Sequence, residues 1–331
     1  MRCFQKVEVR VLKPEMTEYR CHGRECRGCG AVTYTALPPE VEGNVFGERL
    51  TAVVAVLAGR YRLSKRLIQS ALSDLLGIHI SVGASEGRAN GKAKRAWIWV
   101  AATVLVTVFR ISTSRGSDVA KALLGEDQAG FLVTDRWCSY NWYDLGLRQL
   151  FWSHLTRDFQ GFIDRGGEGQ RLGELLLLER NKMFRWWHRV RDDTLARGDF
   201  QRRMKPVERR LGHPLREAEV RAETKTAGKA REILKLERAL WTYVGVEGLE
   251  PTNNFGERSI RPAVMYRKTS FGTQSPAGGR FVERVLTVLA SLKQQQRNPL
   301  EFLTEAIRAH RRGLAPPFLL PRMPGQLALA A

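Results

Sequence analysis

One aspartate stands where metal chemistry could be carried out. Strand-forming residues in FLVTDRWCSYNW (131–142) place Asp135 at the carboxyl end of a strand, the edge where open α/β sheets bind ligands. A carboxylate there can hold a divalent metal ion for phosphoryl chemistry. An aspartate that only caps the following turn would leave the same pattern, so both interpretations stay open.

A glutamate in a basic block is the second candidate. In EPTNNFGERSIRPAVMYRKTSFGTQS (250–275), Glu257 follows Asn254 by three residues. That spacing is typical of a capping box, in which Glu257 bonds back to the cap, and Glu257 can also pair with Arg261 at i, i+4. The functional interpretation makes Glu257 a metal ligand inside a set of phosphate-binding cations, which are Arg258, Arg261, Arg267 and Lys268.

Three cysteines cluster in CHGRECRGCG (21–30). Cys26 and Cys29 form a knuckle suited to tetrahedral zinc. Cys21 and His22 could supply a third ligand and Cys3 a fourth, but only one ligand pair is clear. Reduced thiols without a metal are the alternative.

His154, in FWSHLTRDF (151–159), could face a catalytic centre or be a structural histidine.

Composition indicates a polyanionic partner. The 331 residues include 54 Lys and Arg against 34 Asp and Glu, a net charge of +20, which predicts nucleic-acid binding. The longest apolar run, 98–109, is too short to span a bilayer, so no membrane partner is expected. Five cysteines are an odd number and fit a reducing cytoplasm better than a disulfide framework. The expected location is the cytoplasm, in association with the nucleoid.

Helices and strands alternate around these residues. Apolar spacing predicts helices over 50–61 and 64–76, the second ended by Gly77, and then a Gly-rich loop over 81–95. Period-two alternation predicts a strand at 6–12, and β-branched and aromatic runs predict strands at AWIWVAAT, LVTVFRIS, FLVTD and RQLFWSHL. SDVAKALLG, the charged 165–241 region and 280–296 are expected to be helical. The order indicates an α/β or α+β fold.

These segments together resemble the transposases of the insertion sequence 66 family, over about Cys26 to Asn298. The segments that carry the resemblance are LPPEV, GRYRLSKR, DLLGIHIS, KRAWIWVA, SRGSDVAKALLGE, LVTDRWCSYNW, FWSHLTRDFQ, EPTNNFGERSIRP, RKTSFGTQS and RFVERVLTV.

The resemblance implies a DDE-type transposase with a ribonuclease-H-like core. Two Asp and one Glu would hold two divalent ions, Mg²⁺ or Mn²⁺, for cleavage and transfer of DNA strands. Asp135 matches the second acid and Glu257 the third, 122 positions later, so the helices between them look like an insertion in the core. Cys26 and Cys29 match the second half of the family's zinc-binding region, which this chain begins inside.

The first catalytic Asp has no match. In the family it lies on a strand shortly before the segment that resembles GKAKRAWIWV, and here the intervening SVGASEGRAN (81–90) has Glu86 as its only acid. The pattern resembles an internal deletion of that strand and the helices before it. Loss of a carboxylate that bridges both metal ions predicts an inactive or impaired enzyme.

The resulting architecture is an α/β (α+β) chain whose ribonuclease-H-like mixed sheet is interrupted by a helical insertion. Its expected parts are a zinc-region remnant (1–36), a helical region and linker (37–95), the first part of the core (96–160), a basic helical insertion (161–249), the second part of the core (250–300) and a tail (301–331). The expected partners are element ends and target DNA, with a homo-oligomer or a mixed oligomer with full-length transposase. The alternative function is a non-catalytic DNA-binding protein or an inhibitor of full-length transposase.

Overall fold

The structure is a computed structural model that describes residues 3–8, 12–39, 41, 46–79, 96–270 and 275–321. The chain divides into two compact units. Unit 1 comprises residues 1–113 and 258–331, and unit 2 comprises residues 114–257. The predicted strand at 6–12 is absent from its described residues, and 9–11 lie outside the described part. The loop expected over 81–95 lies outside it as well, and so does Glu86.

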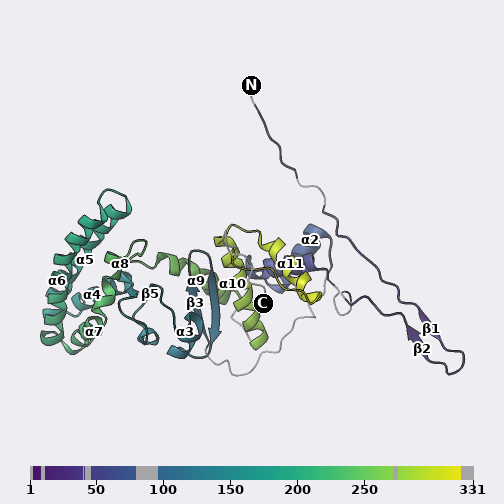
Figure 1. Ribbon diagram of the computed structural model, residues 1–331, viewed down its shortest axis with the longest axis horizontal. Coiled ribbons are helices and arrows are strands. Elements are labelled where there is room, and N and C mark those ends of the chain that lie inside the picture. The colour runs from purple at the N-terminus through teal and green to yellow at the C-terminus, as the bar shows by residue number, and fades with distance from the viewer. Residues whose placement is uncertain are drawn as a thin grey trace. The chain divides into compact units, whose positions relative to one another are not determined.

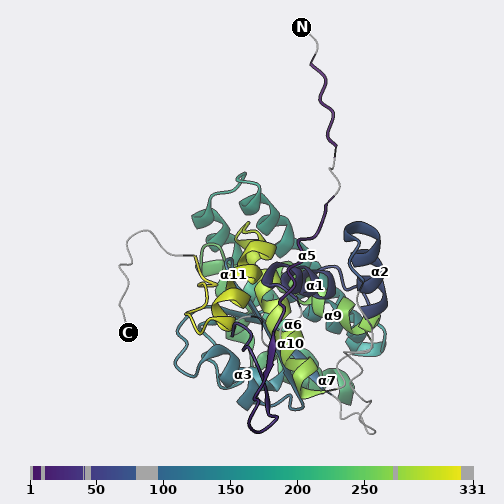
Figure 2. The same ribbon diagram turned by 90° about the vertical axis from the view of Figure 1, so that its right-hand side faces the viewer.

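Unit 1 contains the outer parts of the chain. Its elements are β1 (Gly23–Glu25), β2 (Val32–Tyr34), α1 (Glu48–Gly59), α2 (Lys65–Leu76), β3 (Trp97–Ala102), β4 (Thr107–Ser112), α10 (Pro276–Gln294) and α11 (Pro299–Arg311), with most of α9 (Asn254–Ser270). The helix α1 packs against α10 and α11 (Figure 2). Gly77 ends α2 with a φ of 65°, the left-handed conformation expected of a C-cap glycine.

The hairpin of β3 and β4 is covered by α10 (Figure 1). Three backbone N–H groups on the outer edge of β4 donate to α10 side chains that are one helical turn apart. Thr107 donates to Ser291 Oγ at 3.1 Å, Phe109 to Thr287 Oγ1 at 3.0 Å and Ile111 to Glu283 Oε1 at 2.5 Å. Helix side chains thus satisfy donors that a further strand would otherwise bind.

Unit 2 begins with a small α/β part. It contains α3 (Ser117–Leu124), β5 (Leu132–Thr134), the 3₁₀ turn η2 (Cys138–Tyr140) and β6 (Arg148–Leu150). The strands β5 and β6 are parallel, with Thr134 opposite Leu150. Their carboxyl ends therefore lie at the same edge.

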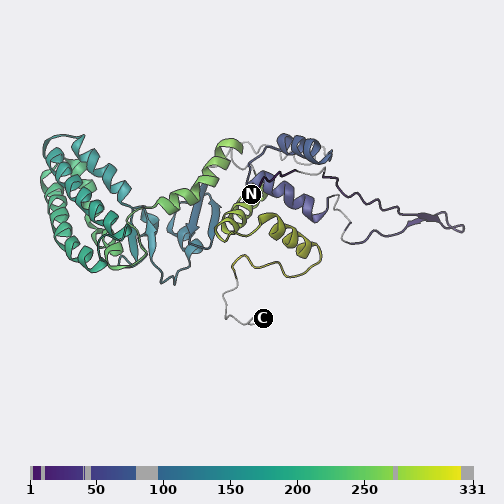
Figure 3. The same ribbon diagram turned by 90° about the horizontal axis from the view of Figure 1, so that it is seen from above.

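The rest of unit 2 is helical. Its elements are α4 (Trp152–Ile163), α5 (Gly167–Arg191), α6 (Arg197–Arg221), α7 (Thr224–Leu234), η3 (Glu237–Leu240) and α8 (Thr242–Gly245). Figure 3 shows α4 to α7 as the teal to green helices at the left. They bury one continuous core that includes Trp152, Phe159, Phe162 and Tyr243, all fully buried.

Most of the predicted elements are confirmed. The exceptions are the strand at 6–12, the expected tail (301–331), which begins within the helix α11, and one strand that is wrong in part. The strand expected at RQLFWSHL is only Arg148–Leu150, and a helix begins at Trp152. Trp152, Leu155, Phe159 and Phe162 are buried at helical spacing, so tertiary packing of this face decides the conformation over the strand propensity of Phe151 and Trp152.

The strands do not form one continuous sheet within the described part of the chain. They pair as three two-stranded sheets, β1 with β2, β3 with β4 and β5 with β6. The fold is therefore of the mixed α+β class and is mostly helical. No helix in the described ranges is both long and apolar enough to cross a bilayer.

Candidate functional site

Asp135 is the first residue after β5. Its Oδ1 accepts a hydrogen bond from the Trp137 backbone N–H at 2.9 Å, so the carboxylate does cap the next turn. That bond uses one oxygen and fixes the direction of the carboxylate. The capping role and a role as metal ligand are therefore compatible.

The Asp135 turn is held by a buried guanidinium. Arg148, on β6, is fully buried and donates to Thr134 Oγ1 at 2.8 Å and to the Asp135 carbonyl at 2.9 Å. It also donates to the Tyr140 carbonyl at 3.2 Å. Burial lowers the pKa of Arg148, and the charge of Asp135 opposes that shift. The sequence patterns did not single out Arg148, although an arginine inside a short strand next to apolar residues was a usable signal.

The segment that precedes α9 is connected to the Asp135 end of the sheet by two successive backbone hydrogen bonds. Phe151 N–H, after β6, donates to the Thr134 carbonyl at 3.1 Å. The next residue, Trp152, donates from its N–H to the Pro251 carbonyl at 3.1 Å. Pro251 lies just before α9, which carries Glu257 in its first turn. These bonds fasten the approach to α9 against the edge where β5 and β6 end.

The N-cap of α9 is Asn253, so the capping box expected from Asn254 and Glu257 is wrong. Asn253 Oδ1 accepts from the Gly256 N–H at 3.1 Å, and α9 begins at Asn254. Glu257 is thereby one position beyond the place from which a glutamate bonds back to the cap. Because two asparagines are adjacent, the sequence alone does not show which of them is the N-cap. Glu257 is exposed and has no ion pair within the part that the structure describes.

His154 lies in the field of both carboxylates. Burial is the largest cause that lowers its pKa, followed by the charge of Arg157. Asp135 and Glu257 both oppose that shift, because each favours the protonated imidazole. One imidazole on α4 therefore responds to both of the acids that the sequence analysis selected.

Two further groups surround Asp135. Arg136 pairs with the Asp158 carboxylate and is largely buried. Burial, followed by the charge of Asp135, raises the pKa of Tyr140 to about 12. Trp137 is exposed, with the Arg115 guanidinium 3.8 Å from its ring centroid and its indole N–H bonded to the Arg115 carbonyl.

The phosphate-binding candidates lie along α9. Arg258, Arg261, Arg267 and Lys268 are all exposed.

The cysteine candidates lie on the β1–β2 hairpin. Gly30 N–H donates to the Cys26 carbonyl and Cys26 N–H to the Ala31 carbonyl, both at 2.8 Å, which closes the turn. Hydrogen bonds from the Gly28 and Cys29 backbones, and then from the Cys29 side chain, lower the pKa of Cys26. Cys21 and Cys3 are exposed, and no third potential ligand joins Cys26 and Cys29 in the described ranges.

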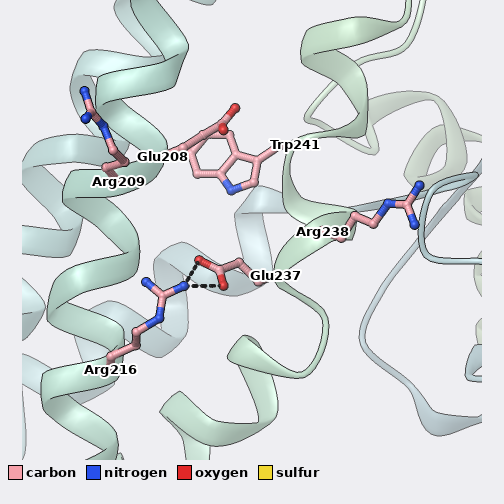
Figure 4. A pocket seen from close by; sticks show the side chains of 6 residues that line it. All are labelled: Glu208, Arg209, Arg216, Glu237, Arg238 and Trp241. Atoms are coloured by element: carbon pink, nitrogen blue, oxygen red, sulfur yellow. Dashed lines mark hydrogen bonds and ion pairs between the residues drawn. The ribbon is translucent and has the colours of Figure 1, made fainter.

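A cavity of about 400 Å³ lies elsewhere in unit 2, between α6 and η3 (Figure 4). The Arg216 guanidinium bonds both oxygens of Glu237 there, at 3.0 and 2.7 Å. Burial and the charge of Glu237 raise the pKa of Glu208. Neither Asp135 nor Glu257 lines this cavity, so it is separate from the candidate site.

The fold and the site define a mixed α and β protein in which two carboxylates act on one imidazole. Carboxylate oxygens are ligands that suit hard divalent cations. The family model described as Transposase IS66 family matches residues 80–281, and the chain therefore belongs to that family.

One relative matches part of the chain. The "Uncharacterized protein y4qI" of Sinorhizobium fredii (strain NBRC 101917 / NGR234) is 25% identical over 248 residues, which make up 66% of this chain and 44% of that protein. This chain therefore spans less than half the length of that relative. No solved structure matches.

Proposed function

We propose that this chain is a DNA-binding transposase-type protein whose Asp135 and Glu257 are two of the three acids of a metal-dependent strand-transfer site, and that catalysis is impaired. The observation that supports the proposal is the pair of adjacent hydrogen bonds, from Phe151 to Thr134 and from Trp152 to Pro251, which holds the segment before α9 at the edge where β5 ends. Membership of the transposase family supports the reaction class.

The donor set fits Mg²⁺ or Mn²⁺, because both acids offer hard oxygen ligands. A bound pair of ions would activate water and then a DNA 3′-hydroxyl for in-line attack on a phosphodiester. The chain's own residues orient the ligands. The Trp137 N–H fixes one Asp135 oxygen and Arg148 fixes the turn. On α9, the exposed cations Arg258, Arg261, Arg267 and Lys268 are proposed to bind DNA phosphates.

Within the described part of the chain the proposed site is one acid short, because no group of three or more His, Cys, Asp or Glu residues that could hold a metal ion occurs there. The hairpin of β3 and β4 and the pair of β5 and β6 share no strand. We propose that a ribonuclease-H-like core here lacks its central first strand with the first catalytic Asp.

A strand-cleavage assay tests this proposal. With Mg²⁺ or Mn²⁺ and a duplex that carries the element's ends, the chain should cleave no faster than background, and Glu257→Gln should change little. Reinsertion of the missing strand with its Asp, between Ser81 and Gly91, should restore cleavage, and Glu257→Gln in that background should abolish it. Cleavage by the unmodified chain that is lost in Glu86→Gln would overturn the deletion argument.

A non-catalytic role is the second candidate, and the charge distribution favours it. Unit 1 carries 29 Lys and Arg against 12 Asp and Glu, so it retains a strong attraction for DNA. An inhibitor would lower strand transfer by full-length transposase when the two are mixed. Titration of this chain into an active transposase, with pull-down of tagged copies, distinguishes mixed oligomers from competition for DNA.

Zinc binding at Cys26 and Cys29 is proposed to be weak, since a structural site needs about four ligands. Metal analysis of the purified protein should find well under one zinc ion per chain. Stoichiometric zinc that survives a mild chelator would show that Cys21, His22 or Cys3 completes the site.

A further inference from the structure

The excess of positive over negative charge in unit 2 lies in one half of a helical hairpin. The helices α5 and α6 run antiparallel and are joined by residues 192–196 (Figure 1). We call residues 180–210, on both sides of this turn, the distal half. It carries eleven Lys and Arg against four Asp and Glu, whereas the rest of unit 2 carries 14 against 18.

On the remaining, proximal part of α5 and α6, the exposed arginines form ion pairs. Arg171 bonds Glu168 and Glu217 at 2.8 and 2.5 Å. Arg221 also pairs with Glu217, at 3.4 Å, and Arg231 of α7 pairs with Glu219 at 3.0 Å. This is the usual pattern of a solvated helix face, in which charges of both signs alternate.

The distal half differs, because fewer of its exposed cations form ion pairs. Five exposed side chains form no ion pair within the described part of the chain, namely Arg185, Arg189, Arg203, Lys205 and Arg209. Two like-charged pairs stand at i, i+4, Arg185 with Arg189 and Lys205 with Arg209. Like charges at this spacing destabilise a helix, so the stability of the hairpin does not explain why these residues are there.

These cations stand on a rigid scaffold. Arg203 and Arg189 lie over the Trp186 ring, 4.3 and 5.5 Å from its centroid. The seam below them is filled by the buried side chains Met183, Trp187, Phe200 and Met204. Arg189 and Arg203, which are held against the Trp186 ring, lose little conformational freedom when an anionic partner binds.

We propose that the distal half of the α5–α6 hairpin binds the phosphate backbone of duplex DNA, at a surface distinct from Asp135, Glu257 and the cations of α9. The choice of DNA as the polyanion rests on the proposed function. The array of guanidinium and ammonium groups on two neighbouring helices suits phosphates, and phosphate contacts carry no base information. The surface therefore adds affinity without sequence preference.

A matched pair of charge variants tests the surface in the full chain. The test variant is Arg185→Gln, Lys205→Gln and Arg209→Gln together, which removes three cations that have no ion pair. The control variant is Arg171→Gln, Arg221→Gln and Arg231→Gln, which removes the same charge from paired positions. Circular dichroism establishes that both variants are folded.

The readout is the dependence of duplex affinity on salt. Each phosphate contact contributes about −0.9 to the log–log slope, so the test variant should be shallower by about 2.7 and bind at least about tenfold more weakly at 0.1 M salt. The control should change the slope by less than about one. Equal slopes in the two variants would overturn the proposal.

Lysine acetylation with and without DNA locates the contact independently of folding in any variant. Bound duplex should protect Lys205 several-fold, whereas Lys235, paired with Glu232 at 2.7 Å on the proximal side, should react unchanged. DNA binding that leaves Lys205 unprotected would remove the hairpin surface and leave the proposed function standing. Duplex RNA that displaces DNA at lower concentration than DNA of equal length would overturn the choice of DNA, and the absence of any duplex binding would overturn both proposals.

Discussion

Single residues decide how the candidate site responds to protons. His154 receives opposing influences, since burial and Arg157 lower its pKa while Asp135 and Glu257 raise it. Neutralising either acid removes a charge that stabilises the imidazolium. Asp135→Asn and Glu257→Gln should therefore each lower the His154 pKa further, and Arg157→Gln should raise it. An NMR titration of the imidazole measures these shifts.

The control for that titration is Asp193→Asn, in the exposed turn between α5 and α6, which should leave the His154 pKa unchanged.

The His154 imidazole also predicts a pH dependence of the free energy of unfolding. Its folded pKa is below the unfolded value of 6.5, so folding favours the neutral ring. The stabilising contribution is complete above pH 6.5 and is lost as the pH falls toward the folded pKa. A His154 pKa unmoved by both acid substitutions would separate the two carboxylates from the imidazole.

The buried guanidinium of Arg148 is the second prediction at this scale. It donates to Thr134, Asp135 and Tyr140, and a lysine ammonium cannot reproduce that planar set of bonds. Arg148→Lys should lower the free energy of unfolding by about 3 kcal/mol, because buried acceptors lose their donors. Urea denaturation measures the loss. Arg157→Lys, at an exposed position of α4, is the control and should stay within about 0.5 kcal/mol.

At the scale of elements, side chains of α10 bind backbone N–H groups of β4 that a neighbouring strand would otherwise bind. Thr287 accepts from the Phe109 N–H at 3.0 Å, where a neighbouring strand would have supplied a carbonyl. Thr287→Val keeps the shape and removes the acceptor, and it should cost about 1–2 kcal/mol of unfolding free energy because the Phe109 donor is left without a partner. Thermal or urea denaturation measures the cost.

Thr269→Val is the matched control, because its hydroxyl donates to the Met265 carbonyl on the exposed face of α9. It should change the free energy of unfolding by less than about 0.5 kcal/mol. Equal effects at the two positions would mean that the side chains of α10 do not stabilise the edge of β4.

At the scale of the molecule, charge is divided unequally between the units. Unit 2 carries 25 Lys and Arg against 22 Asp and Glu, so most of the +20 belongs to unit 1. Long-range attraction of this kind acts on phosphates and not on bases. The chain should therefore bind repeat and scrambled duplexes with equal affinity, and the affinity should fall steeply with salt. Filter binding measures both, and strong discrimination between the duplexes would contradict the prediction.

The sequence by itself determined the elements whose signals are local. The β-branched and aromatic runs in AWIWVAAT and LVTVFRIS, the run before Asp135 and the glycine that ends α2 predicted the observed strands and cap. It also selected the family through segments distributed over most of the chain, and the family match confirmed that resemblance. Such features depend on neighbours within a few residues, so short stretches of the sequence are enough to predict them.

The tertiary structure alone decided what depends on distant partners. The helix that begins at Trp152 forms because its apolar face is buried by the core of unit 2. Asn253 rather than Asn254 caps α9, and Glu257 is therefore not at the capping-box position. Arg148 donates to the Asp135 carbonyl and so holds that turn. The strands pair in three separate sheets. Burial and hydrogen-bond geometry join residues far apart in the chain, and no local pattern records which partners they find.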